Sequence, residues 1–222
     1  MIITKKRDTK AVLENIRNYR RIFLVGCGEC AALCATGGRP QLEQMKELLH
    51  AHGKEVTGMH LAKTGCQVLG TKRELSPHKE AIAAADCILA LSCGAGAQTV
   101  VELNEDKPVC SANDSMYLGN MTRHQVFDER CSMCGECILD KTAGICPVTA
   151  CPKGILIGPC GGVADGKCEV SPDLPCVWIR IYERMKKLDQ LDEFSASVPS
   201  PKDWSRGARP HNGNAKEPKN SR

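Results

Sequence analysis

Aromatic residues are scarce in this 222-residue chain: three Phe, three Tyr and two Trp together make up 4% of it. Proteins that bind nucleic acid use aromatic side chains as stacking platforms and a basic surface for the phosphates. The net charge of +4 does not form such a surface, because residues 201–222 hold six basic and two acidic side chains and leave the first 200 residues neutral. We therefore expect no nucleic-acid partner.

Long apolar runs are also missing. No stretch approaches the roughly 20 apolar residues that cross a bilayer. Residues 1–21 begin with charged side chains and lack the apolar core and small-residue cleavage site of a secretory signal. The sequence therefore predicts a cytoplasmic protein without a membrane span, in a compartment where disulfides are rare.

Cysteine, by contrast, is abundant, with 15 residues. An odd number cannot pair completely, and a reducing cytoplasm disfavours disulfides. The six His lie outside the cysteine clusters, and no paired carboxylates or nucleophile with a neighbouring base stand out as a catalytic constellation. Metal binding is the leading explanation and thiol catalysis the second, so we expect a chain that carries electrons and has no catalytic residues of its own.

Residues 1–125 alternate between helical and strand patterns. Such alternation predicts an α/β fold with an open, mostly parallel sheet and flanking helices. In sheets of this kind, binding groups collect at the carboxyl ends of the strands. The expected helices cover residues 9–21, 39–53, 76–86 and 94–104, and the expected strands cover residues 22–25, 55–62, 87–93 and 107–110.

The pattern changes after residue 125. Residues 126–176 hold eight cysteines among many Gly and Pro, with almost no apolar periodicity, so we expect bound metal to organise this small irregular region. Residues 177–194 restore helical spacing and predict one amphipathic helix that packs on the first domain. Residues 195–222, rich in Ser, Pro, Lys and Asn, are expected to form a flexible basic tail.

Three chemistries compete for the stretch LVGCGECAALCATGG, residues 24–38. Its glycines match a dinucleotide-binding fingerprint, but the next strand ends without the acidic residue that would hold the ribose. Cys27 and Cys30 form the C-x-x-C of a redox dithiol. A third thiol, that of Cys34, favours metal binding over thiol exchange.

Cysteines follow three of the expected strands: Cys27, Cys66 and Cys93. The carboxyl ends of parallel strands meet at one edge, so we expect these thiols to converge there with those of Cys30 and Cys34. A 4Fe–4S cluster needs four thiolates and gains from backbone N–H groups aimed at its sulfurs, whereas zinc uses the same residue type. The chain is expected to approach a cluster closely at three glycines: Gly28, Gly94 and Gly96.

A second cysteine field begins with Cys131, Cys134 and Cys137. Their C-x-x-C-x-x-C spacing is that of a ferredoxin-type run that supplies three ligands of one cluster. The usual fourth ligand, a Cys-Pro, is delayed to Cys146. Other candidates for this fourth position are Cys151 and Cys160, while two cysteines are left over for a structural role or a small zinc site: Cys168 and Cys176.

Six motifs together resemble the small iron–sulfur subunit of the two-subunit methylenetetrahydrofolate reductases of acetogenic bacteria, and the related C-terminal domain family of some folate reductases. The motifs are VGCGECAALCATGG, TGCQ, LSCGAGAQ, ERCSMCGECILDKTAGICPVTACPKGILIGPCGG, DGKCEV and PKDW. The resemblance runs from Ile22 to Trp204 and is densest over residues 130–162.

The resemblance implies a flavin-binding (β/α)8-barrel partner that reduces 5,10-methylenetetrahydrofolate to 5-methyltetrahydrofolate in the reductive acetyl-CoA pathway. This chain would pass electrons from a low-potential donor such as ferredoxin, through two 4Fe–4S clusters, to the partner's flavin. One ligand set would fall among Cys27, Cys30, Cys34, Cys66 and Cys93, and the other among Cys131, Cys134, Cys137, Cys146, Cys151 and Cys160. Within these sets we favour Cys30, Cys34, Cys66 and Cys93, with Cys27 as a close rival, and Cys131, Cys134, Cys137 and Cys146.

Two alternatives remain beside this expectation. Zinc in place of, or beside, one cluster would make the chain a scaffolding module of a flavoprotein complex that carries no electrons. A thiol–disulfide enzyme that uses Cys27 and Cys30 is the third hypothesis.

Overall fold

The computed structural model describes residues 1–196, 201–204 and 207. The chain divides into two compact units, an N-terminal unit (Met1–Glu129) and a C-terminal unit (Arg130–Arg222). Most of the basic tail expected over residues 195–222 lies outside the described residues. Among the helices that the structure describes, none has the length and apolar character needed to cross a bilayer.

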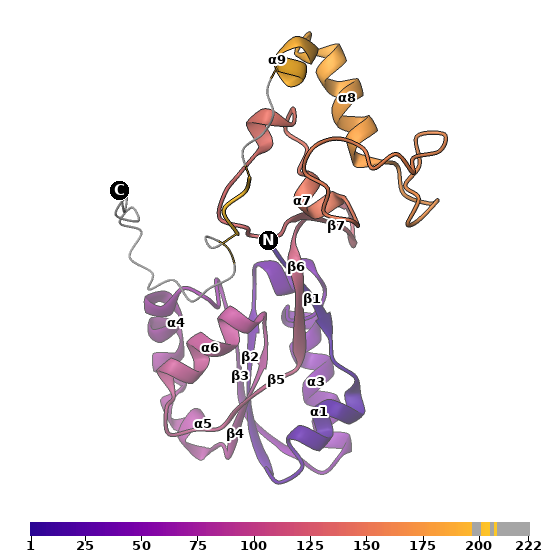
Figure 1. The fold of residues 1–222 in the computed structure, drawn as a ribbon. Coiled ribbons are helices and arrows are strands. Elements are labelled where there is room, and N and C mark those ends of the chain that lie inside the picture. Colours follow the sequence, from indigo (N-terminus) through magenta and orange to yellow (C-terminus); the bar gives the residue numbers. More distant parts are fainter. Residues whose placement is uncertain (197–200, 205–206, 208–222) are drawn as a thin grey trace. The chain divides into compact units, whose positions relative to one another are not determined.

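Four parallel strands form the central sheet of the N-terminal unit, in the order β3-β2-β4-β5 (Figure 1). They are β2 (Arg21–Cys27), β3 (Glu55–Ala62), β4 (Cys87–Leu91) and β5 (Val109–Ser111). Six of the seven residues of β2 and all five of β4 are buried, as expected for parallel strands that are covered on both faces. The sheet confirms the α/β fold predicted from the alternating pattern.

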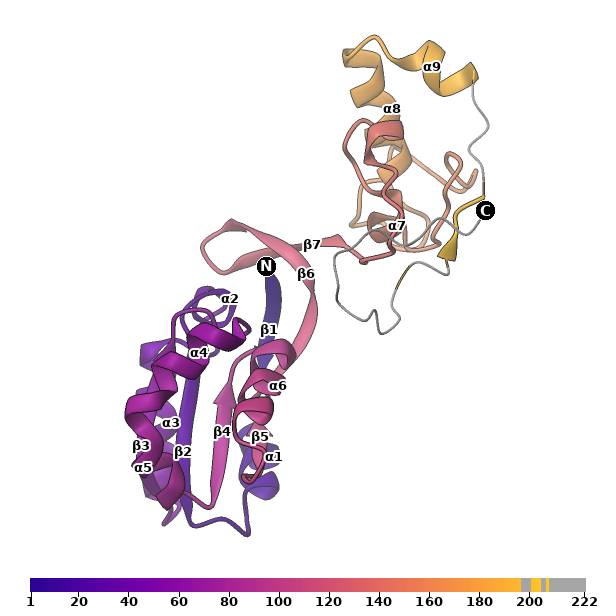
Figure 2. The same cartoon turned by 90° about the vertical axis from the view of Figure 1, so that its left-hand side faces the viewer.

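Helices cover both faces of this sheet (Figure 2). They are α1 (Thr9–Asn15), α2 (Cys30–Leu33), α3 (Arg39–Ala51), α4 (Val68–Leu75), the 3-10 turn η1 (Ser76–His78), α5 (Lys79–Ala84) and α6 (Gly94–Leu103). Apolar residues of α1 and α3 pack with Leu24 and Leu89 in one core, and those of α4, α5 and α6 pack with Phe23 and Ile88 in another. Successive strand residues thus face opposite cores, as the period of two requires.

A second sheet of three strands was not predicted. It consists of β1 (Ile2–Lys6), β6 (Asn113–Arg123) and β7 (Val126–Cys131), in the order β1-β6-β7, with β1 antiparallel to β6. In β6 the two buried residues are Asn113 and Gly119, so no alternation of apolar and polar residues marks the strand. The sequence signal for a half-buried strand is that alternation.

Three helices of the N-terminal unit also differ from the prediction, because α1 is shorter than expected and α2 and α4 were not expected. The helix expected over residues 9–21 ends at Asn15, and the Lys54 ammonium then donates hydrogen bonds to the carbonyls of Ile16 and Tyr19, at 2.8 and 2.7 Å. These bonds hold the chain in turns where helical hydrogen bonds would otherwise continue. Helix α4 was missed, because its short sequence contains Gly70 and few apolar residues.

The C-terminal unit consists mainly of turns. Its described elements are η2 (Leu139–Lys141), α7 (Pro147–Ala150), α8 (Val177–Lys187) and α9 (Leu191–Ala196). The predicted C-terminal helix is confirmed and begins at Val177, but it ends at Lys187 instead of residue 194, since Asp189 adopts a φ of +56° and separates α8 from α9. The buried stripe of α8 packs on residues of its own unit, among them Ile145 and Cys151.

Candidate metal centres

Four cysteines lie around the carboxyl edge of the central sheet. Cys27 is the last residue of β2, Cys30 begins α2, and Cys93 is the N-cap of α6, which follows β4. Cys66 lies in the loop between β3 and α4. Cys27 and Cys93 are buried, Cys30 is partly buried and Cys66 is exposed. The edge therefore presents thiols from the ends of three different strands.

These four thiols are close enough to influence one another's charge. Burial raises the pKa of the Cys66 thiol, and the charges of Cys93, Cys27 and Cys30 raise it further, in that order. The Gly65 N–H donates a hydrogen bond to the Cys27 Sγ at 3.4 Å, so the Cys66 loop lies directly on the end of β2. Mutual repulsion among nearby thiolates is relieved when they bind a cation or a cluster iron.

Cys34 lies elsewhere. Its thiol donates a hydrogen bond to the Ile2 carbonyl of β1 at 3.9 Å. The nearby Thr36 hydroxyl is also bonded toward β1, 2.6 Å from the Thr4 hydroxyl. The structure thus places the Cys34 thiol against β1, whereas Cys27 is among the thiols that raise the pKa of Cys66.

The three glycines expected at this site have defined backbone roles. The Gly28 N–H donates to the Ala62 carbonyl and the Gly94 N–H to the Ser115 hydroxyl, both at 2.8 Å. A Cβ on Gly96 would lie 2.9 Å from the Ser92 Oγ, so only glycine fits there without displacing Ser92. At this edge the Gly65 N–H donates to a thiol, that of Cys27, and no sequence pattern had indicated Gly65.

Within the described ranges, no group of three or more His, Cys, Asp or Glu side chains is placed to hold a single metal ion. Around zinc, sulfurs at about 2.3 Å from the ion stand about 3.8 Å apart. A four-iron cubane is larger than an ion and binds one thiolate at each iron, so its ligands stand further apart.

The second cysteine field starts where β7 ends, at Cys131. The Met133 N–H donates to the Cys131 Sγ at 3.3 Å, and the Cys134 thiol donates to the Glu136 carbonyl at 3.6 Å. The Cys146 thiol contacts the Thr149 hydroxyl at 3.7 Å, and that hydroxyl is 2.9 Å from the hydroxyl of Ser132. Side-chain hydrogen bonds thus connect the favoured fourth ligand to the C-x-x-C-x-x-C loop.

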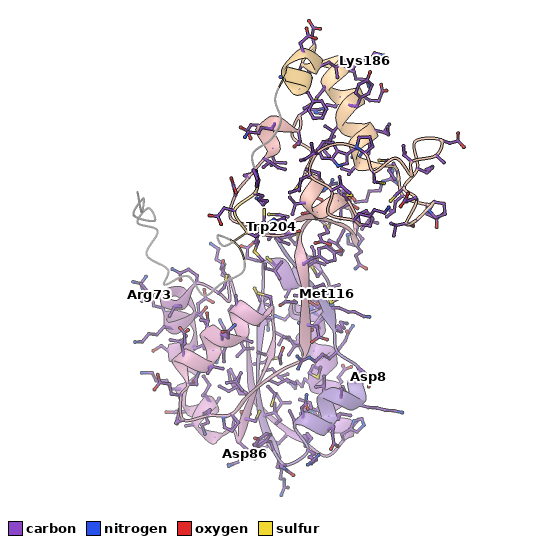
Figure 3. All side chains as sticks on the ribbon, in the orientation of Figure 1. Asp8, Arg73, Asp86, Met116, Lys186 and Trp204 are labelled. Atoms are coloured by element: carbon purple, nitrogen blue, oxygen red, sulfur yellow. The ribbon has the colours of Figure 1, made fainter. Side chains whose placement is uncertain are left out.

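Part of the PKDW motif contacts this loop. The Lys202 ammonium donates to the Glu136 carbonyl, and the Asp203 N–H donates to the Glu136 Oε2 at 2.7 Å. The Lys202 Nζ also lies 5.6 Å from the ring centre of Trp204, which is labelled in Figure 3 and is 56% exposed. The segment 201–204 therefore packs beside the middle of the ferredoxin-like run.

The last four cysteines, Cys151, Cys160, Cys168 and Cys176, line one small cavity of the C-terminal unit. None of the four favoured ligands from Cys131 to Cys146 takes part in its lining. The Gly162 N–H, followed by the charge of Lys153, lowers the pKa of the Cys160 thiol and so favours its thiolate. The sequence gives Cys168 and Cys176 no ferredoxin-like spacing, and only the fold reveals that they share a cavity with Cys151 and Cys160.

A separate thiol pair lies at the amino end of β4. The Cys87 thiol donates a hydrogen bond to the Cys110 Sγ of β5 at 3.7 Å. That bond lowers the pKa of Cys110 to about 7, with help from the positive charge of Arg7, and it raises the pKa of Cys87. Asp86, labelled in Figure 3, precedes the pair, and its ion pair with Arg21 at 2.8 Å lowers the carboxyl pKa to about 2.

Comparison with protein families gave a match for the C-terminal part of the chain. Residues 110–205 match a protein family described as the methylene-tetrahydrofolate reductase C terminal. The match covers less than half of the chain, begins at β5 and includes all eight cysteines of the second field. It relates this part of the chain to methylenetetrahydrofolate reductases. Searches of curated proteins and of solved structures found no match.

Proposed function

We propose that the chain is the electron-transfer iron–sulfur subunit of a methylenetetrahydrofolate reductase. It takes electrons from a low-potential donor such as ferredoxin and passes them to the flavin of a (β/α)8-barrel partner, which reduces 5,10-methylenetetrahydrofolate to 5-methyltetrahydrofolate. The observation that carries this proposal is the family match over residues 110–205, because that segment contains the ferredoxin-like cysteine run.

Two sets of thiols are assigned to the two clusters. The edge of the central sheet supplies Cys27, Cys30, Cys66 and Cys93, which are grouped by their mutual effect on the pKa of Cys66. The second field supplies Cys131, Cys134, Cys137 and Cys146. A bound 4Fe–4S cluster accepts and releases one electron at a time, with a potential set by its surroundings.

The chain's own residues hold and tune the clusters. Loss of the proton from Cys66, whose pKa is raised, accompanies ligation at the sheet edge. The Gly65 N–H, 3.4 Å from the Cys27 Sγ, stabilises negative charge on that sulfur. Burial of Cys27 and Cys93 keeps water from two of the four sulfurs. Each of these features influences the potential at which an electron enters or leaves.

The test uses the full chain, purified without air together with its flavoprotein partner. Iron and acid-labile sulfide should be present in equal amounts, and reduction should give the paramagnetic resonance signals of two clusters. Cys66→Ser should remove about half of the iron, since it takes one ligand from one of two clusters. Its matched control, Cys34→Ser, should keep all of it because this thiol faces β1. A colourless protein that contains only zinc would rule the proposal out.

A scaffolding role without electron transfer is the second candidate. It is favoured by the small size of the four-cysteine cavity in the C-terminal unit, which suits an ion better than a cluster. On this alternative, Cys134→Ser would destabilise the chain but leave flavin reduction unchanged in complexes that still assemble. Loss of flavin reduction in assembled complexes, with the barrel subunit still loaded with flavin, supports electron transfer instead.

A further inference from the structure

The four cysteines Cys151, Cys160, Cys168 and Cys176 surround a cavity of about 20 Å³. Apolar side chains complete much of its wall, among them Val163 and Trp178. We propose that this cavity is a mononuclear zinc site with four cysteine ligands, separate from both clusters. The inference is independent of the electron-transfer function, because it concerns thiols that neither cluster uses.

The size of the cavity decides between an ion and a cluster. A space of roughly 10–15 Å³ on the same measure holds one water molecule. The 20 Å³ found here therefore accommodates one body of that size, such as a metal ion, and is too small for a cubane of four irons and four sulfides. Four thiolates around a single ion are the ligand set of a structural zinc site.

The backbone holds the later two cysteines on a short hairpin. The Cys168 N–H donates to the Leu174 carbonyl at 2.9 Å, and the Cys176 N–H donates to the Gly166 carbonyl at 2.8 Å. Antiparallel bridges pair Lys167 with Ala164 and with Pro175. These bonds fix the spacing of the two thiols before any metal is present, as a zinc site with low reorganisation cost requires.

The other two cysteines come from structure on either side of the loop. Cys151 is the C-cap of α7, and its N–H donates to the Pro147 carbonyl at 3.0 Å. Cys160 is exposed and lies between Gly158 and Gly161, which have φ values of +92° and +80°. Although the four thiols line one cavity, no three of them stand around a single point in the described residues, so ligation requires the glycine-rich turn of Cys160 and its neighbours to close on the ion.

Bound zinc would also stabilise residues 151–176, which bury too little apolar surface to fold by themselves. Residues 151–176 contain only isolated bridges as regular pairing. They contact the apolar core of the unit at Cys151 and Cys176, and the Ile155 carbonyl accepts a hydrogen bond from the Trp178 indole N–H at 2.9 Å. Folding such a segment costs backbone entropy of about 1–2 kcal/mol per residue. A structural zinc site offsets that cost directly, because its binding energy is folding energy.

Metal analysis of the full chain tests the site. The chain, purified without air, should contain one zinc, and X-ray absorption at the zinc edge should report sulfur neighbours alone, at about 2.3 Å. Cys168→Ser and Cys176→Ser should each lower the zinc content at least fivefold while the first cluster's iron remains. Cys34→Ser is the control and should retain both metals.

Several results would overturn the proposal. These are an iron-loaded wild-type chain without zinc, nitrogen or oxygen atoms among the zinc neighbours, or full zinc retention in the Cys168 and Cys176 variants. Because the absorption measurement uses the wild-type chain, it decides the question even if the variants fail to fold. Iron and sulfide, measured in the same samples, report on the electron-transfer proposal separately, so either can fail alone.

Discussion

The two units of the chain are stabilised in different ways. Of the twelve largest fully buried side chains in the described residues, all but Ile181 belong to the N-terminal unit. That unit covers its sheet with helices and has two apolar cores. The C-terminal unit has one small core, built on the buried face of α8. Burial can hold the first unit, whereas the second needs another source of stability.

Backbone conformation shows the same contrast. The C-terminal unit contains ten of the thirteen described residues with left-handed φ values: Met133, Gly135, Ala143, Gly144, Gly154, Gly158, Gly161, Asp165, Gly166 and Asp189. Four of the ten are not glycine and adopt this conformation at a cost. A chain that turns so often cannot bury a continuous apolar face, but it can bring distant thiols together. The N-terminal unit thus positions its thiols by its sheet, whereas the C-terminal unit positions them by its turns.

Metal removal should affect the two units most differently. On the proposed function, bound metal supplies much of the folding energy of the C-terminal unit, so treatment of the purified chain with a strong chelator under reducing conditions should unfold that unit. The N-terminal unit should keep its sheet, since Leu24, Leu89 and their neighbours remain fully buried. Amide hydrogen exchange followed by mass spectrometry measures this directly, unit by unit.

The expected exchange pattern after chelation is specific. Peptides from residues 130–196 should lose nearly all protection, while those from β2 and β4 should keep theirs. A chain reloaded with metal serves as the control and should regain protection over the same residues. Equal loss in both units would show that the N-terminal core is not self-sufficient.

Truncation of the N-terminal core should have the next largest effect. Leu89 is fully buried at the centre of β4, so Leu89→Ala leaves a cavity and should lower the free energy of unfolding of this unit by about 2–5 kcal/mol. Val101 lies on α6 with 46% of its surface exposed, and Val101→Ala should change that free energy by less than about 0.5 kcal/mol. Denaturant unfolding of the two variants gives both values. An unchanged free energy of unfolding in Leu89→Ala would contradict a core built on this residue.

Much of the N-terminal unit could be predicted from the sequence. Strand β3 matches its predicted bounds, and β2 and β4 contain most of the residues predicted for them, because buried parallel strands form continuous apolar runs. Strands β1, β6 and β7 escaped prediction, since exposed strands carry little apolar alternation. Burial drives the pattern that sequence reasoning detects, so elements with little burial stay hidden.

The candidate cysteine sites were predictable only in part, because irregular turns position some of the thiols. The topology of a parallel sheet places Cys27, Cys66 and Cys93 at one edge, and the sequence pattern of strands is enough to infer it. It cannot tell Cys27 from Cys34, because α2 is a single turn whose direction depends on contacts with β1. Nor could spacing alone pair Cys168 and Cys176 with Cys151 and Cys160, because turns of irregular conformation bring them together.

The smallest expected effect concerns the thiol pair that lies outside all three ligand sets. The pKa of Cys110 is lowered to about 7, first by the hydrogen bond from the Cys87 thiol. A lowered pKa in the folded state favours the thiolate, so folding is stabilised above the unfolded pKa of about 8.5, and this contribution is lost as the pH falls through 7. Since Cys110 is partly exposed, alkylation should follow its thiolate fraction and rise with a midpoint near pH 7.

Substitution of Cys87, the hydrogen-bond donor, tests the cause of the lowered pKa of Cys110. Cys87→Ala removes the hydrogen bond and should move the alkylation midpoint of Cys110 upward, toward about 8.5, whereas Cys87→Ser retains a donor and should move it less. Mass spectrometry of digested, alkylated chain measures each cysteine separately across the pH range. Thiols bound to metal in the C-terminal unit should stay unmodified under the same conditions, because alkylation requires a free thiolate. An unchanged midpoint in Cys87→Ala would show that Arg7, and not the thiol, sets the charge of Cys110.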